Sequence, residues 1–174
     1  MTTAARRLRI VAAAIFLTLA AFVPATAAGS HNWMTQKSGV AATLNDVSCA
    51  SVIDCYAVGQ SGVIITTHNG GATWSKIQNP FSGTGQGLSS IRCGSAGHCA
   101  VVIRPNLVMT TANAGKIWQI HIIKFPSTIS QVNRVACPAA NTCYITLAPS
   151  GNPFSWFSHS GAMYKTTNGG LTWS

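Results

Sequence analysis

The stretch CYAVGQSGVIITTHNGGATW, Cys55 to Trp74, decides the fold because it returns twice along the chain. MTTANAGKIW ends at Trp118, and MYKTTNGGLTW ends at Trp173. Trp74 and Trp118 lie 44 residues apart, and Trp173 lies 55 residues further on, so the third copy carries an 11-residue insertion. A fixed period with repeated content indicates a repeat architecture.

Each copy predicts four short β-strands. In the first copy they are LNDVSC, CYAVGQ, GVIITTH and TWSKIQ, which are rich in Val, Ile, Thr and Tyr and are bounded by turn residues. Four strands within about 44 residues are typical of a β-propeller blade. We therefore predict an all-β chain of about three propeller-type blades, each of four antiparallel strands, with repeats at about 42–85, 86–129 and 130–174.

The segment between the third and fourth strands predicts a tight turn. The Thr67 and Asn69 side chains can hydrogen-bond the backbone of the turn, and Gly71 can adopt a conformation that few other residues accept. Thr73 and Trp74 begin the fourth strand, where we expect the indole to pack against the neighbouring blade. The repeated motif is therefore interpreted as a folding device.

This turn resembles the Asp-box, or bacterial neuraminidase repeat, Ser/Thr-x-Asp-x-Gly-x-Thr-Trp, with Asn in place of Asp. Together with Ala57-Val58-Gly59 and Gly62, the unit is also similar to the sialidase-like propellers of the photosystem II assembly factor family. The matching positions are Thr67, Asn69, Gly71, Thr73 and Trp74 in the first copy, Thr111, Asn113, Gly115 and Trp118 in the second (Ile117 replaces Thr), and Thr166 or Thr167, Asn168, Gly170, Thr172 and Trp173 in the third. The resemblance implies a propeller, but Asp-boxes occur in sialidases, xyloglucanases, sorting receptors and assembly factors alike.

The six cysteines follow the same repeat. Each copy contains a Cys-x5-Cys pair at the turn between its first and second strands. The spacing predicts three equivalent disulfides, Cys49–Cys55, Cys93–Cys99 and Cys137–Cys143. A zinc site is the alternative, but the pairs belong to different blades and should lie far apart, so we expect no metal and no cofactor.

The N-terminus has the pattern of a secretory signal peptide. Arg6, Arg7 and Arg9 precede an apolar run over 10–23, and Ala25-Thr26-Ala27 supplies the small residues at which a signal peptidase cleaves. We expect residues 1–27 to be removed and 28–174 to form an extracytoplasmic, secreted protein; an uncleaved membrane anchor is the alternative.

The mature segment is mildly basic, and its charges do not indicate nucleic-acid binding. Its basic residues are scattered singly, without a run or an aromatic-interleaved stripe. Counted from the sequence, they are Lys37, Lys76, Arg92, Arg104, Lys116, Lys124, Arg134 and Lys165, against Asp46 and Asp54. Such a surface could adhere to anionic envelope polymers, but the favoured interpretation is a solvated surface that net charge keeps soluble.

The insertion in the third copy is the predicted binding region. The loop that contains it reads APSGNPFSWFSHSG, Ala148 to Gly161, and includes Phe154, Trp156, Phe157 and His159. In a propeller it falls on the face opposite the box turns, where aromatics can stack on sugars, pack on a protein partner or fold back over the core. We therefore expect a protein- or glycan-binding scaffold for assembly at the cell envelope.

Enzymatic activity is not expected. Glycoside hydrolysis usually requires two carboxyl groups flanking the scissile bond, whereas the whole chain contains only Asp46 and Asp54 and no Glu. The alternative interpretation is a fragment of a sialidase-like glycoside hydrolase. Trp33 resembles the end of a preceding unit, and LTWS stops where a last strand would begin, which favours either a longer protein or self-association that completes the propeller.

Overall fold

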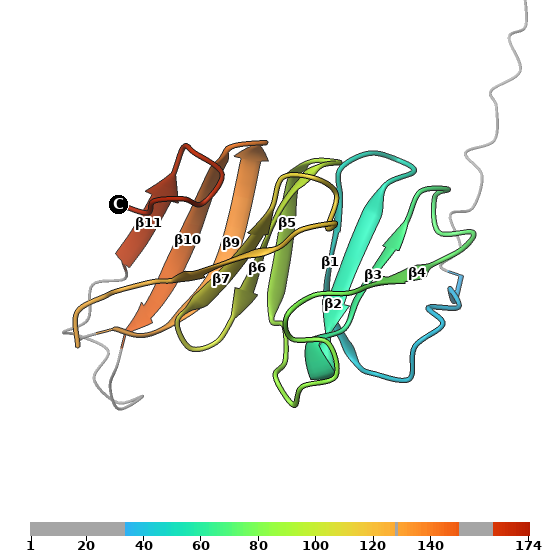
Figure 1. Cartoon of the computed structure of the whole chain (residues 1–174), viewed down its shortest axis with the longest axis horizontal. Coiled ribbons are helices and arrows are strands. Elements are labelled where there is room, and N and C mark those ends of the chain that lie inside the picture. The colour runs from blue at the N-terminus through green and yellow to red at the C-terminus, as the bar shows by residue number, and fades with distance from the viewer. Residues whose placement is uncertain (1–33, 128, 150–161) are drawn as a thin grey trace, which may run out of the picture. The chain divides into compact units, whose positions relative to one another are not determined.

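The strands of the protein form three antiparallel sheets that follow one another along the chain (Figure 1). The computed structural model describes residues 34–127, 129–149 and 162–174. Blade 1 comprises β1 (Leu44–Cys49), β2 (Cys55–Gly59), β3 (Ile64–Thr67) and β4 (Ser75–Ile77), with a short 3-10 turn at Gln60–Gly62. Blade 2 comprises β5 (Ser90–Ser95), β6 (His98–Ile103), β7 (Leu107–Thr111) and β8 (Gln119–Ile122). Blade 3 comprises β9 (Ile129–Ala139), β10 (Thr142–Pro149) and β11 (Ala162–Thr166).

The predicted all-β architecture of propeller-type blades is confirmed. Within each sheet, strands that follow one another along the chain pair antiparallel, in the orders β1-β2-β3-β4, β5-β6-β7-β8 and β11-β10-β9. Blade 3 has three strands in the described part of the chain. Beside β11, Ser174 exchanges two backbone hydrogen bonds with Lys165, of 2.8 and 3.0 Å, as the first residue of a fourth strand would.

The hydrophobic core lies between the blades because alternate residues of each strand point to opposite faces of a sheet. Between blades 1 and 2, the cluster includes Tyr56, Val58, Val101 and Met109. Between blades 2 and 3, a second cluster takes the other face of β6 and β7 together with residues of β9 and β10. The middle strands of blade 2, β6 and β7, are therefore buried on both faces, which explains their nearly continuous apolar runs.

The innermost strands of neighbouring blades are tied together by side chains of blade 1. The Asp46 carboxylate accepts a hydrogen bond from the Ile91 N–H at 3.0 Å and pairs with Arg92 at 2.7 Å. The Ser48 hydroxyl accepts from the Cys93 N–H, and the Tyr56 hydroxyl donates to the Ala96 carbonyl. These contacts set the position of β5 against β1, and with it the stacking of the blades.

All three predicted disulfides are present, Cys49–Cys55, Cys93–Cys99 and Cys137–Cys143. In each blade, the residue that follows the box asparagine donates a backbone hydrogen bond to the turn that the disulfide closes. The three bonds are Gly70 to Ile53, Ala114 to Gly97 and Gly169 to Asn141, at 3.1, 3.0 and 3.0 Å. The box turns and disulfides therefore share one end of each blade.

The connections β2–β3 and β4–β5 meet at the opposite end of blade 1. The Gly62 N–H donates to the Gln86 carbonyl at 2.7 Å, and the Gly83 N–H donates to Ser61 at 3.1 Å. Gly62 has a φ of +68°, and a Cβ on it would lie 1.7 Å from the Phe81 carbonyl oxygen. This close approach requires glycine and fixes the loop end of the blade.

One face of blade 1 has no blade packed against it in the described structure. Val47 lies on this face and is 55% exposed, whereas Ile91, at the equivalent position of blade 2, is fully buried. Gln36 approaches the box Gly71 on this side, just as Ile77 of blade 1 approaches the box Gly115 of blade 2. The segment that contains Gln36 therefore takes the place that an outer strand takes at the next interface.

The predicted signal peptide, residues 1–27, lies outside the described residues, so its removal stays a prediction. Contacts divide the chain after Met34, and the three blades all belong to the unit 35–174. Within the residues that are described, no helix has the length and apolar character needed to cross a bilayer.

Candidate binding surfaces

The box residues form the turns that the sequence predicted. In blade 1, the Thr67 hydroxyl accepts hydrogen bonds from the N–H groups of Asn69 and Gly71 and donates to the Asn69 side chain. The side-chain Oδ1 of Asn69 in turn accepts a hydrogen bond from the Thr73 N–H at 2.9 Å. The side chains of Thr67 and Asn69 thus satisfy the backbone of the turn.

The same network recurs in the other two blades with one informative difference. In blade 3, Thr166 rather than Thr167 holds the turn, because its hydroxyl accepts from the Gly170 N–H at 2.9 Å. The Asn amide donates to the box threonine in blades 1 and 3, Asn69 to Thr73 and Asn168 to Thr172. Ile117 stands at this position in blade 2, where Asn113 holds only the backbone N–H of Ile117, at 2.8 Å.

The box tryptophans pack at the blade interfaces where a preceding blade is described. Trp118 contacts the cluster between blades 1 and 2, and Trp173 contacts the cluster between blades 2 and 3. Trp74 instead lines a groove of about 430 Å³ on the open face of blade 1, with Leu44 and Val47. The expected packing of Trp74 against another blade is thus not seen among the described residues.

Both acidic residues are engaged in structural contacts. Burial raises the pKa of the Asp46 carboxyl, but the hydrogen bond from Ile91 and the charge of Arg92 outweigh it and hold the pKa below its usual range. The hydrogen bonds of Asp54 to His68, at 2.8 Å, and to Ser51 likewise lower its pKa. A general acid of a glycosidase needs a raised pKa, so neither carboxyl group is suited to that role.

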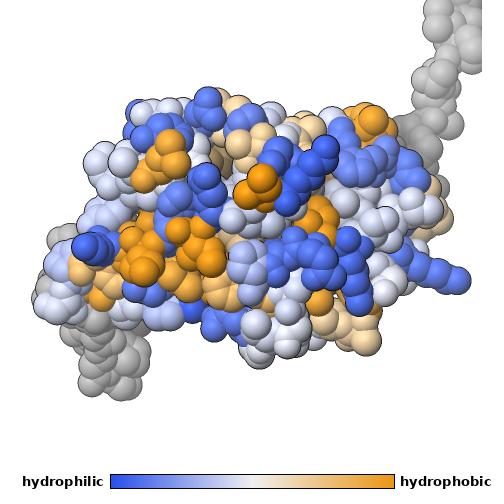
Figure 2. Space-filling view, viewed as in Figure 1, coloured by the Kyte–Doolittle hydropathy of each residue, from blue (hydrophilic) through white to orange (hydrophobic). Residues whose placement is uncertain are grey.

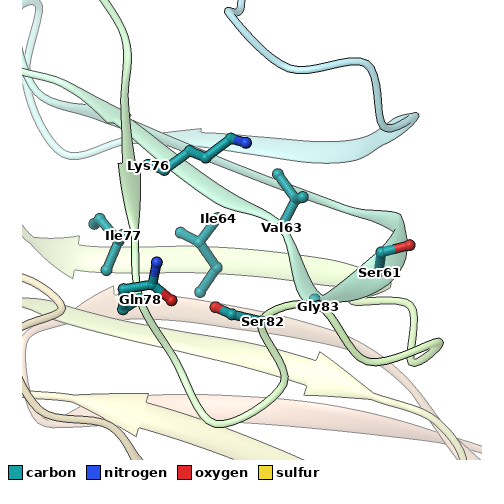
Figure 3. A pocket seen from close by; sticks show the side chains of 9 residues that line it. Ser61, Val63, Ile64, Lys76, Ile77, Gln78, Ser82 and Gly83 are labelled. Atoms are coloured by element: carbon teal, nitrogen blue, oxygen red, sulfur yellow. The ribbon is translucent and has the colours of Figure 1, made fainter.

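A pocket of about 360 Å³ lies at the loop end of blade 1, beside β3 and β4 (Figure 3). Ile64 and Ile77 supply apolar walls, while Lys76, Gln78 and Ser82 surround them with polar groups. Asn79 fixes the adjoining loop through hydrogen bonds to the Gly62 carbonyl and the Ser82 hydroxyl, of 2.8 and 3.0 Å. The pocket is small and open, and nothing in its lining selects a particular ligand.

A larger apolar surface lies on the outer strand of blade 2. Ile117, Ile120 and Ile122 are 65%, 45% and 66% exposed, and Leu171 of the last box turn is 63% exposed. Figure 2 shows hydrophobic side chains gathered over the segment that contains β8. Large exposed aliphatic groups of this kind commonly mark interaction sites.

A groove of about 760 Å³ adjoins this surface between β8 and blade 3. It is lined by Ile120, Ile122, Lys124, Tyr164 and Trp173, among others. His121 also lines it, and its Nε2 lies 2.9 Å from the Thr110 hydroxyl. Burial lowers the pKa of His121, so at neutral pH this edge gains no positive charge from the imidazole.

The aromatic residues predicted to bind a partner, Phe154, Trp156, Phe157 and His159, lie outside the described residues. Their segment joins β10 to β11, so it connects the second and third strands of blade 3. The sequence analysis did not predict the isoleucine surface of blade 2. An alignment of the repeats contains the signal, because residues 117, 120 and 122 are apolar where blade 1 has Thr73, Lys76 and Gln78.

Solved structures of known proteins share this architecture. Two solved structures of YCF48 match: one entitled YCF48 bound to D1 peptide, with a TM-score of 0.59 and 19% identity, and one from Cyanidioschyzon merolae, with a TM-score of 0.58 and 22% identity. Each match covers 76% of this chain and 40% or 39% of the solved chain, so this chain spans about two fifths of their length. The GH74 enzyme of Niastella koreensis matches with a TM-score of 0.51 and 13% identity over 75% of this chain and 22% of the enzyme.

Among curated proteins, sequence comparison finds no significant match. Because the sequence identities to these solved structures are low, the structural likenesses show the propeller fold alone. The family described as photosynthesis system II assembly factor YCF48 matches residues 25–174, which is most of the chain. The chain therefore belongs to this family of BNR-repeat propeller proteins.

Proposed function

We propose that this protein is an exported, non-enzymatic scaffold that binds a protein partner during assembly at the cell envelope. The observation that carries the proposal is the exposed isoleucine surface of blade 2, formed by Ile117, Ile120 and Ile122. Exposed aliphatic side chains of this kind suit a polypeptide, whose own apolar side chains can pack against them. Membership of the YCF48 family supports the proposal, since one solved structure of YCF48 is described as bound to D1 peptide.

Export is supported by the three disulfides together with the N-terminal sequence. Disulfides form and persist in oxidising compartments and are rare in the cytosol. Fusion of residues 1–27 to alkaline phosphatase, which is active only after export, tests this part of the proposal. We expect phosphatase activity and a processed N-terminus, and a fusion without activity would contradict export.

The absence of enzymatic activity is proposed on chemical grounds. Both carboxyl groups of the chain have lowered pKa values and are held by Arg92 or His68. The full chain produced in the periplasm should release no product from fluorogenic sialosides or xyloglucan oligosaccharides. Turnover that is lost in Asp46→Asn, while the near-UV circular dichroism is retained, would establish a glycosidase and overturn the proposal.

Selection from a random peptide display library tests the binding of a protein partner directly. A glycan array tests carbohydrate binding in parallel. We expect enrichment of peptides that bind in the micromolar range, about −8 kcal/mol, and no binding to the array. Enrichment on the glycan array alone would replace the protein partner with a carbohydrate. The aromatic segment with Phe154, Trp156, Phe157 and His159 is the first region to examine in that case.

A further inference from the structure

The outer strands of blades 1 and 2 have equivalent positions in the fold but differ in polarity. Each strand lies at the edge of its sheet and pairs with the preceding strand in the same register, Lys76 opposite Ile65 and Ile120 opposite Met109. Three exposed positions change from polar to apolar: Thr73 and Ile117, Lys76 and Ile120, and Gln78 and Ile122. Blade 1 thus shows that the scaffold does not need isoleucine at these positions.

The backbone of β8 presents a free edge at two of these isoleucines. The Ile123 N–H donates inward, to the Asn106 carbonyl at 2.8 Å. Because antiparallel strands alternate between inward and outward hydrogen-bonding positions, His121 also points inward and Ile120 and Ile122 point their N–H and C=O groups outward. Within the described part of the chain, β7 is the strand that pairs with β8, and its other side is open.

Natural proteins usually protect such an edge with charged residues, above all lysine. Lys76 stands at the edge of β4 in blade 1 and fits this pattern. Ile120 and Ile122 leave the edge of β8 both apolar and accessible, beside the groove of about 760 Å³. An edge of this kind is suited to the addition of a strand from a partner.

The charged residues around the edge of β8 indicate which kind of partner strand would bind there. Lys116 precedes it in the box turn, and Lys124 follows it and lines the groove. The two acidic residues of the chain both belong to blade 1, where Asp46 pairs with Arg92 of blade 2 and Asp54 pairs with His68. Basic groups at both ends of an apolar edge favour an apolar segment with acidic flanks.

We infer that β8 binds an extended, apolar peptide segment with acidic flanking residues by strand addition, with its backbone on Ile120 and Ile122 and its side chains in the adjoining groove. This inference rests on the proposed function and assigns its binding site. Pairing with the β8 of a second copy is disfavoured because it would bring together two edges that carry only basic charges. The peptide is therefore the occupant that the charges support.

The test measures the affinity of a fluorescein-labelled peptide of alternating valine and threonine, with two glutamates at each end, by fluorescence anisotropy. Ile120→Lys with Ile122→Gln transplants the residues of blade 1, so the variant should keep the wild-type melting temperature. We expect this swap to weaken binding by roughly tenfold or more. The matched control, Lys76→Ala with Gln78→Ala in blade 1, should change the affinity by less than about twofold.

Two further probes separate strand addition from general adhesion. A peptide with N-methylated backbone amides should lose affinity, because it cannot donate to the edge, and a lysine-flanked peptide should lose affinity through charge. Binding that is absent in the wild type, or equal for the swap or the N-methylated peptide, overturns the inference. A wild-type dimer in sedimentation that the swap abolishes would assign the edge to self-association and also overturn it.

The failure of this inference and the failure of the proposed function are distinguishable. Peptides enriched from the display library that bind the wild type and the swap equally would retain the protein-binding role and remove β8 as its site. A library without enrichment would remove the role itself.

Discussion

Blades 1 and 2 are built on one plan and differ where the fold does not constrain them. Both carry a disulfide between their first two strands, a box turn held by threonine and asparagine, and four strands in the same order. They differ in what packs on them and in the polarity of their outer strands. The comparison separates residues that build a blade from residues that serve its surroundings.

The inner strands show this separation most clearly. Val47 of β1 is 55% exposed, while Ile91, 44 residues later in β5, is fully buried against blade 1. The position is the same within the blade, but its environment is set by the neighbouring blade. A substitution at the two sites therefore measures the interface between blades rather than the blade itself.

Ile91→Ala should produce the largest effect. We expect it to lower the free energy of unfolding by about 2–5 kcal/mol, as for other buried large-to-small changes. Val47→Ala should cost less than about 0.5 kcal/mol, as for most exposed positions. Urea denaturation of both variants checks the comparison, and equal costs would show that the open face of blade 1 is covered in solution.

Asp46 should produce an intermediate, pH-dependent effect. Its lowered folded-state pKa means that its contribution to stability is complete above the unfolded pKa of about 3.9 and is lost as the pH falls below it. Asp46→Asn should cost about 1–3 kcal/mol at pH 7 by weakening the bonds to Ile91 and Arg92. Denaturation of both proteins from pH 7 to pH 2 is the measurement. A gap that does not narrow in acid would contradict the assigned role of the carboxylate.

The smallest predicted effect concerns the box turn of blade 2. Ala114 has a φ of +59°, at the position where blade 1 has Gly70 with a φ of +67°. Ala114→Gly should relieve the strain of a Cβ in this conformation and raise the stability by about 0.5–1 kcal/mol. Gly70→Ala is the matched control and should lower the stability by a similar amount. Thermal melting that shows no gain in Ala114→Gly would mean that the turn of blade 2 carries no strain.

The sequence was sufficient to predict the architecture because the evidence repeats. LNDVSC predicted β1 to the residue, and the Cys-x5-Cys spacing predicted all three disulfides. The turn chemistry of Thr67, Asn69 and Gly71 was also predicted, because it depends on residues close together in the chain. Local patterns with a repeated context are the part of a fold that sequence reasoning recovers most reliably.

The candidate binding edge could not be predicted in the same way. Taken alone, the alternating sequence Gln119-Ile120-His121-Ile122 predicts a half-buried strand with its isoleucines in the core. Whether they are buried depends on the next strand and the next blade, which are distant in the sequence. The exposure of Ile120 and Ile122 emerges only from the assembled sheets.

The contrast between β8 and β4 is tested most directly by hydrogen exchange of the full chain with and without the glutamate-flanked valine–threonine peptide. Strand addition at β8 predicts that the amides of Ile120 and Ile122 exchange more slowly in the complex, while the amide of Lys76 in β4 exchanges at an unchanged rate. Protection of Lys76 to the same extent, or protection confined to the loop end of the blades, would contradict binding at the β8 edge.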